Sequence, residues 1–221
     1  MEERQTRAGQ ASYSSAGAES EGRGPERLEA FSDGVFAIAI TLLVLEIRVP
    51  AADRFVSPRV LLDALGELWP SYLGYLVSFV TIGIMWANHH NLFRHVRRVD
   101  HSLLLANLFL LLGVGFVPFP TALLAASIGE PSAQVGVLVY SGTFVAIALA
   151  FNVLWYRARK GGHLLRQDTS RASIEAITRS YRYGVPGYLL SFLLALVNPT
   201  LGMVVIIALV IVYLLPRSSG A

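Results

Sequence analysis

Long apolar runs alternate with short polar connections along most of this chain. Six of the runs approach the roughly 20 residues that a helix needs to cross a hydrocarbon layer about 30 Å thick. Their approximate bounds are 28–47, 68–86, 103–126, 135–155, 183–197 and 201–215. Asn198 and Pro199 separate the last two runs, whose combined length is too great for one crossing. The pattern predicts an all-α integral membrane protein with six transmembrane helices.

The composition supports this fold class. The 221 residues are 54% hydrophobic and only 15% charged, and the mean hydropathy of +0.54 is too high for an ordinary soluble domain. Residues 1–25 are rich in Gly, Ser, Ala, Glu and Arg and contain no apolar segment like that of a signal peptide. We therefore expect a disordered cytoplasmic tail over 1–25, a six-helix transmembrane domain over 26–217 and a short tail over 218–221.

The basic residues predict the orientation of the chain. Of the 18 Lys and Arg residues, only Arg48, Arg54 and Arg59 fall on one predicted side of the membrane, and fifteen fall on the other. By the positive-inside rule, both termini are cytoplasmic. The net charge of +3 does not indicate a nucleic-acid partner, because these arginines flank the apolar runs and are interspersed with acidic residues.

The connections and one apolar run carry further signals. Residues 48–68 are long enough for a short amphipathic segment along the outer membrane interface. The connection 157–182 is cytoplasmic in this topology, and its pattern leaves open whether it is helical. Pro118 and Pro120 lie inside the third run, where each removes a backbone donor and predicts a kink or break.

An aspartate opens the first apolar run, which reads "RLEAFSDGVFAIAITLLVLEI". Ser32 or Asp33 can accept hydrogen bonds from the free N–H groups at a helix start. Alternatively, Asp33 belongs to a polar cluster inside the subunit, since a buried carboxylate needs partners. The cytoplasmic end of the second run, "MWANHHNLFR", supplies candidates at the same depth. The predicted cluster comprises Arg27, Phe31, Ser32, Asp33, Trp86, Asn88, His89 and His90, with Arg27 or Arg94 balancing the charge.

Catalytic and metal chemistry find little support in the sequence. His89 and His90 are adjacent, so on a helix they point about 100° apart and cannot bind one ion without a third element. Cysteine is absent, and the His-Glu-x-x-His and Gly-x-Ser-x-Gly motifs do not occur. We predict no enzyme activity, no metal site and no cofactor.

Helical geometry separates two faces of the first run. With Ile38 at zero and about 100° per residue, Leu45 falls near −20° and Leu42 near 40°, while Thr41 falls near −60°. Gly34 belongs to the same stripe, whereas Asp33 lies about 140° away. Periodicity alone favours packing of this stripe in the bundle core over contact with lipid.

These residues also carry a resemblance to a known family. Arg27, Phe31, Ser32 and Asp33 form an Arg-x-x-x-Phe-Ser-Asp motif, and "WANHHNLFR" at 86–94 and "PFPT" at 118–121 accompany it. Together they resemble the transmembrane protein 175 family of potassium channels, from about residue 26 onward. The chain length is similar to that of the bacterial branch, in which one six-span unit is a subunit and four subunits assemble.

The resemblance implies a homotetramer in a bacterial plasma membrane, with the first span lining a central pore for potassium ions. The family's hydrophobic constriction falls on Ile38 and Leu45, with Leu42 beside them, and its threonine layer falls on Thr41. The polar cluster around Asp33 would then brace the pore helix. On this resemblance the stripe faces a pore and not the bundle core.

The expected activity is passive, leak-type conduction of potassium in preference to sodium. The chain has no "TVGYG" carbonyl filter, so selectivity would arise from ion dehydration in an apolar neck and from the Thr41 hydroxyl groups. No span is rich in arginine, so strong voltage gating is not expected. The rival hypothesis is a proton-coupled transporter that uses Asp33 and His89 as titrating groups.

Overall fold

The computed structural model describes residues 24–160 and 163–214, and their regular secondary structure is helical throughout. The α-helices are α2 (Gly24–Leu42), α3 (Pro58–Glu67), α4 (Trp69–Phe93), α5 (His101–Phe116), α6 (Pro118–Ser127), α7 (Ala133–Lys160), α8 (Arg171–Arg182), α9 (Gly184–Val197) and α10 (Pro199–Leu214). Two short 3-10 helices, η1 (Leu43–Glu46) and η2 (Ala52–Arg54), follow α2. The predicted tails 1–25 and 218–221 lie outside the described residues, except that Gly24 and Pro25 begin α2.

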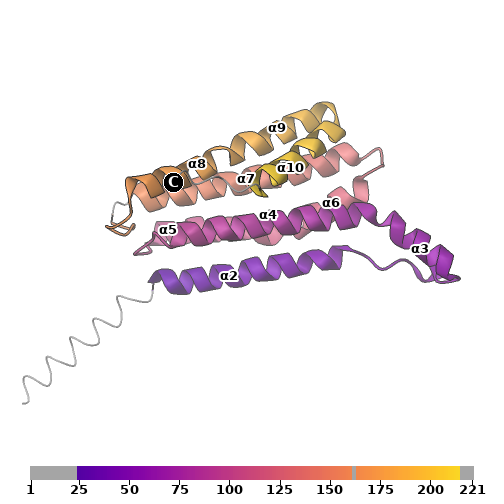
Figure 1. Cartoon of the computed structure of the whole chain (residues 1–221), viewed down its shortest axis with the longest axis horizontal. Helices are drawn as coiled ribbons and strands as arrows, with labels where there is room; N and C mark the ends of the chain where they lie inside the picture. The colour runs from indigo at the N-terminus through magenta and orange to yellow at the C-terminus, as the bar shows by residue number, and fades with distance from the viewer. Residues whose placement is uncertain (1–23, 161–162, 215–221) are drawn as a thin grey trace, which may run out of the picture.

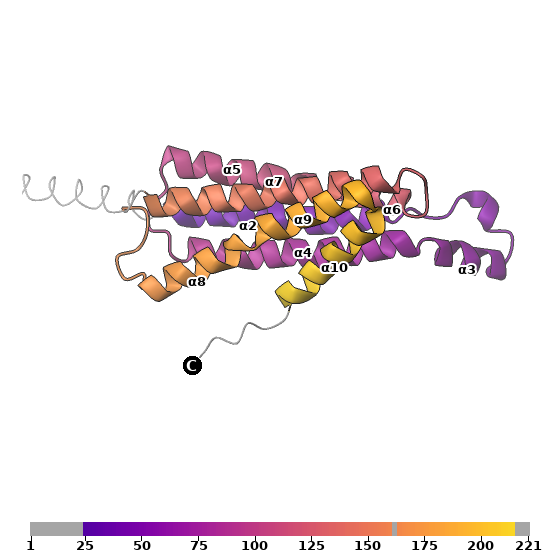
Figure 2. The same ribbon diagram turned by 90° about the horizontal axis from the view of Figure 1, so that it is seen from above.

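The helices form one elongated bundle (Figures 1 and 2). Helix α2 lies along one side of the bundle, and the pair α9 and α10 lies on the opposite side, with α4 to α7 between them (Figure 1). Helix α2 packs against α4 and α5, and α7 packs against α5, α6 and α9. Among the described residues, the face of α2 that is turned away from this packing is largely exposed.

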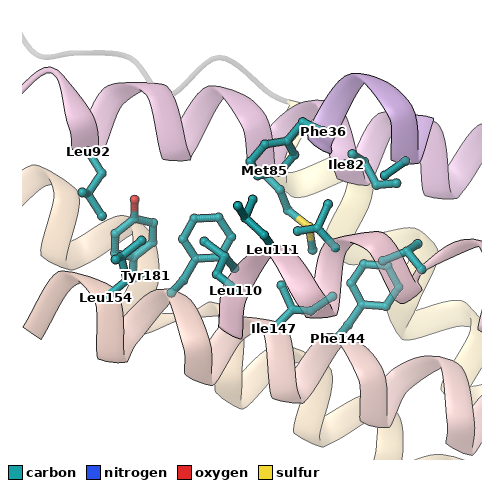
Figure 3. Close-up of a cluster of buried hydrophobic side chains, with 14 of the residues drawn as sticks. Phe36, Ile82, Met85, Leu92, Leu110, Leu111, Phe144, Ile147, Leu154 and Tyr181 are labelled. Atoms are coloured by element: carbon teal, nitrogen blue, oxygen red, sulfur yellow. The ribbon is translucent and has the colours of Figure 1, made fainter. Parts of the chain in front are cut away.

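Apolar side chains from each layer meet in a continuous core. Phe36 of α2 packs there with Ile82 and Met85 of α4, and Phe144 and Ile147 of α7 belong to the same cluster (Figure 3). All five are less than one-tenth exposed. Burial of large apolar and aromatic side chains fixes how each helix is rotated about its own axis.

The six predicted apolar runs are helical. Four helical stretches are long and apolar enough to cross a membrane, and Pro199–Leu214 is a shorter apolar helix. The four are Pro25–Glu46, Trp69–Phe93, His101–Ser127 and Ala133–Lys160. The chain is therefore an all-α membrane protein.

Proline positions account for the two interruptions. The third span divides into α5 and α6 at Val117, where the Val117 N–H donates to the Val114 carbonyl at 3.2 Å instead of one residue further back. Pro118 then begins α6. Between α9 and α10 the chain turns at Asn198, and the Gln134 side chain donates to the carbonyls of Ala195 at 3.0 Å and Leu196 at 2.7 Å. The predicted break and the predicted pair of C-terminal helices are confirmed.

The two ends of the bundle differ in charge. One end, here called the arginine-rich end, carries Arg94, Arg97, Arg98, Arg157, Arg159, Lys160, Arg166, Arg171, Arg179 and Arg182. Asp100 caps α5 at this end by accepting from the Leu103 N–H at 2.7 Å, and this bond lowers the pKa of the Asp100 carboxyl. Helix α3, capped by Ser57, projects beyond the opposite end (Figure 1).

The connection 157–182 is partly helical. It contains α8, which begins after the cap Ser170. The buried side chains of Ile177 and Tyr181 face the bundle, while Arg179 and Arg182 are exposed. Helix α8 is thus amphipathic and joins α9 almost end to end (Figure 2).

Candidate functional site on helix α2

A buried set of three polar side chains joins α2 to α4 and α5. Asn107 Nδ2 donates to Ser32 Oγ at 2.9 Å, and Asn107 Oδ1 lies 2.8 Å from His89 Nε2. All three side chains are completely buried. We call Ser32, His89 and Asn107 the inner polar cluster.

The hydrogen-bond directions within the inner polar cluster follow from Ser32. The Ser32 hydroxyl donates its only hydrogen to the Leu28 carbonyl at 2.7 Å, so toward Asn107 it can only accept. The Asn107 amide nitrogen therefore faces Ser32, and its carbonyl oxygen faces His89. Because that oxygen can only accept, His89 carries a proton on Nε2.

The remaining side of the His89 ring is apolar. The ring stacks on Phe93 with centroids 4.4 Å apart and is tilted against Phe36 at 5.3 Å. Within the described part of the chain, His89 Nδ1 is buried without a hydrogen-bond partner. A proton added at Nδ1 would have no acceptor there, so this environment favours the neutral ring.

A second pair of contacts lies nearer the surface of the α2–α4 junction. Trp86 Nε1 donates to Asp33 Oδ1 at 2.9 Å, and His90 Nδ1 lies 2.8 Å from Glu29 Oε1. The Trp86 and His90 rings stack with centroids 6.0 Å apart. Asp33 therefore contacts the adjacent helix α4, away from Ile38.

Three residues of the sequence-predicted cluster do not join it. Arg27 is exposed, and no ion pair of Arg27 or of Arg94 is found among the described residues. Phe31 is 55% exposed. Asn88 lies on another side of α4, in the lining of a cavity next to α7, α9 and α10.

Sequence reasoning missed Asn107 and Glu29. Asn107 is the one amide in the apolar run of α5, "LLLANLFLLL", and a lone amide in a membrane span commonly bonds to a neighbouring helix. That signal was available in the sequence. Glu29 carried no comparable signal, because it lies near a helix start where exposed acidic residues are ordinary.

The opposite face of α2 is apolar and uncovered. Its stripe comprises Gly34, Ile38, Thr41, Leu42 and Leu45, all exposed in the chain, and we call it the outer stripe. Ile38 is 60% exposed and Leu45 is 69% exposed. The expectation from periodicity that this stripe packs in the bundle core is wrong for the single chain. Periodicity identified the apolar positions, but Phe36, Ala39 and Leu43 are the ones that enter the core.

Thr41 is the one hydroxyl group in the outer stripe. Its Oγ1 donates to the Ile38 carbonyl at 2.9 Å, so its hydrogen is used within α2. Its oxygen keeps acceptor capacity toward the open side. Among the described residues, no group of three His, Asp or Glu side chains is arranged to hold a metal ion.

Comparison with known proteins identifies the family. The family model described as "Endosomal/lysosomal potassium channel TMEM175" matches residues 27–118. The chain is 49% identical over 194 residues to a potassium channel of Chamaesiphon minutus, covering 88% of this chain and 95% of the relative. It is also 49% identical over 176 residues to a potassium channel of Streptomyces collinus, covering 79% and 84%.

A solved structure resembles the fold closely. It is the crystal structure of a lysosomal potassium-selective channel TMEM175 homolog from Chamaesiphon minutus, with a TM-score of 0.77 and 47% identity. The similarity covers 86% of this chain and 95% of that one. On these similarities, the chain belongs to the TMEM175 family.

Proposed function

We propose that this protein is a potassium-permeable, passively conducting cation channel in which the outer stripe of α2 lines the pore. The observation that carries the proposal is the uncovered apolar face of α2, which lies opposite the polar contacts that hold the helix in the bundle. Two bacterial relatives are named potassium channels, which supports potassium as the permeating ion.

One copy of α2 cannot enclose a pore, so we propose a homotetramer around a central axis. Four copies of Ile38, Leu42 and Leu45 would then form apolar rings that block ions by dewetting when narrow and admit them when wider. Four Thr41 oxygens would lie between the rings formed by Ile38 and Leu42. Potassium, which loses its hydration shell more readily than sodium, would pass such a neck preferentially, with moderate selectivity.

The inner polar cluster would act as a brace for the pore helix. It contacts α2 from the side opposite Ile38. Its hydrogen bonds join α2 to α5 and α5 to α4, and Ser32 also donates to the Leu28 carbonyl one turn earlier in α2. The rival function, proton-coupled transport through Asp33 and His89, needs His89 to gain and lose a proton. The apolar surroundings of Nδ1 argue against that step.

The proposed location is a bacterial plasma membrane with both termini in the cytoplasm. The arginine-rich end of the bundle contains the start of α2 and the ends of α4 and α7. A concentration of arginine on the cytoplasmic side is the usual arrangement.

The test is a planar-bilayer recording of the purified, reconstituted protein under a potassium gradient. Currents should follow the electrochemical gradient, with potassium exceeding sodium. Ile38→Asn should hydrate the neck and raise conductance severalfold. The matched control is Ile211→Asn, which changes another exposed isoleucine, on α10, and should leave the current unchanged.

The outcomes separate the two functions. Unchanged current and selectivity in Ile38→Asn would refute the pore assignment. Saturable proton-coupled flux without unitary currents, abolished by Asp33→Asn, would support the transporter.

A further inference from the structure

Asn88 points to a second candidate site, away from the outer stripe. It lines a cavity of about 60 Å³ between α4, α7, α8, α9 and α10. Space that is open to the exterior around this cavity brings the total to about 540 Å³. Met85, Ile147 and Tyr181 contribute to its walls.

The chemistry of the cavity is apolar with an amide at one point. Tyr181 donates its hydroxyl to the backbone carbonyl of Asn88 at 2.9 Å. Asn152, also in the lining, uses its amide hydrogens on the carbonyls of Ala148 and Tyr181. A ligand that fits has an apolar body and a polar group that can pair with Asn88.

We infer that the mouth of the cavity lies between α9 and α10, since Gly184 and Tyr188 of α9 and Val210 and Tyr213 of α10 are among its lining residues. These helices meet at Asn198 and diverge from there, so that the C-terminal end of α10 leaves the bundle (Figure 2). A side chain is missing where they separate: a Cβ at Gly184 would lie 3.5 Å from Ala148 Cβ and 3.7 Å from Tyr213 Oη. The outward faces of both helices are apolar, with Leu190, Leu193, Ile211 and Val212 about half exposed. In a bilayer this mouth is open to lipid.

Positive charge lies on α8, the helix that contributes Ser180 and Tyr181 to the cavity lining. Arg179 and Arg182 lie in the last turn of α8 and are the sequence neighbours of Ser180 and Tyr181, which line the cavity. Both arginines are exposed, and neither forms an ion pair with a carboxylate of the described residues. Arginine binds phosphate groups through charge-assisted hydrogen bonds.

We propose that this cavity binds one anionic phospholipid from the bilayer. An acyl chain enters between α9 and α10, the ester region lies at the Asn88 carboxamide, and the phosphate lies against Arg179 and Arg182. The site is separate from the outer stripe and does not depend on the proposed channel activity.

The test measures lipids that remain bound to the purified protein by native mass spectrometry. The full chain is exchanged into detergent containing equal amounts of phosphatidylglycerol and phosphatidylcholine with identical acyl chains. We expect phosphatidylglycerol to be retained in preference. Gly184→Leu should close the mouth and abolish retention of both lipids, whereas Gly66→Leu, on the exposed surface of α3 where an added Cβ meets nothing within 4 Å, should retain them.

A charge variant distinguishes recognition of the lipid headgroup from binding of the acyl chain. Arg179→Gln with Arg182→Gln should lower the preference for phosphatidylglycerol about tenfold and keep retention of phosphatidylcholine. The control pair, Arg48→Gln with Arg59→Gln at the other end of the bundle, should keep the preference. If Gly184→Leu does not fold, Ala148→Leu narrows the same cavity from α7. Equal retention of the two lipids, or retention that the cavity variants leave unchanged, would overturn the proposal.

Discussion

The two faces of α2 differ in chemistry and in their contacts with the rest of the chain. The inner face presents Ser32 and Asp33, whose polar atoms are bonded to α4 and α5. The outer face presents Ile38, Leu42 and Leu45, whose side chains are 60%, 40% and 69% exposed. A polar group inside a membrane must be paired within the protein, whereas an apolar side chain can face lipid, another subunit or a pore without such pairing.

This contrast suggests that the inner face stabilises the bundle and that the outer face controls conduction. Changes on the inner face should lower the stability of the bundle and leave ion selectivity intact in molecules that fold. Changes on the outer face should alter conduction and leave the stability of the chain intact. Each variant below tests one half of this contrast.

The largest effect is expected for Asn107→Leu. Leucine has a similar volume but leaves His89 Nε2 without an acceptor and Ser32 Oγ without a donor, both in a buried position. The free energy of unfolding should fall by about 1–3 kcal/mol, as measured by thermal unfolding in detergent. The neighbouring Leu108→Ala, at an exposed position, should change it by less than about 0.5 kcal/mol. Wild-type stability in Asn107→Leu would mean that the inner polar cluster does not brace α2.

A smaller effect is expected for Asp33→Ala. The substitution removes the acceptor of the Trp86 indole, in a contact that is not fully buried. Hydrogen bonds between membrane helices contribute about 0.6 kcal/mol on average, so we expect a loss of that size and a lower yield of assembled protein by size-exclusion chromatography. Asp33→Asn keeps an acceptor oxygen and should restore most of the yield. Normal assembly with an altered potassium to sodium ratio would instead locate Asp33 on the ion path.

The sequence predicted the positions of the helices along the chain better than the orientation of each helix about its own axis. The six apolar runs and the interruptions at Pro118 and Asn198 were readable, because span length and missing backbone donors act locally. Which side of α4 faces α2 was not readable. Asn88 and His89 are adjacent, so packing that inserts His89 between Phe36 and Phe93 directs Asn88 elsewhere. That rotation depends on the fit of the whole core, which no single helix determines.

The same limit applies to the outer stripe. Its apolar spacing is compatible with a core, a lipid surface or a pore, and only the arrangement of α4 and α5 around α2 leaves it uncovered. The family motif supplied the pore hypothesis where periodicity favoured the core.

Thr41→Val is expected to have the smallest effect on stability. It gives the clearest separation between an effect on conduction and an effect on stability. Valine has nearly the same shape as threonine, and Thr41 is exposed with its hydrogen bonded only within α2. The free energy of unfolding should therefore change by less than about 0.5 kcal/mol. If the Thr41 oxygen faces permeating ions, its loss removes a ligand that replaces water, and the potassium to sodium permeability ratio should fall. Reversal potentials under bi-ionic conditions measure that ratio.

The matched control for this variant is Thr143→Val. Thr143 lies on α7, and its Oγ1 donates to the Val139 carbonyl at 2.8 Å, as Thr41 does to that of Ile38. Both substitutions thus remove a bond from a threonine hydroxyl to its own helix, and only one lies on the outer stripe. A permeability ratio that falls in Thr41→Val and not in Thr143→Val ties selectivity to the outer face of α2. Equal ratios in both variants would remove Thr41 from the ion path and leave the apolar rings as the sole source of selectivity.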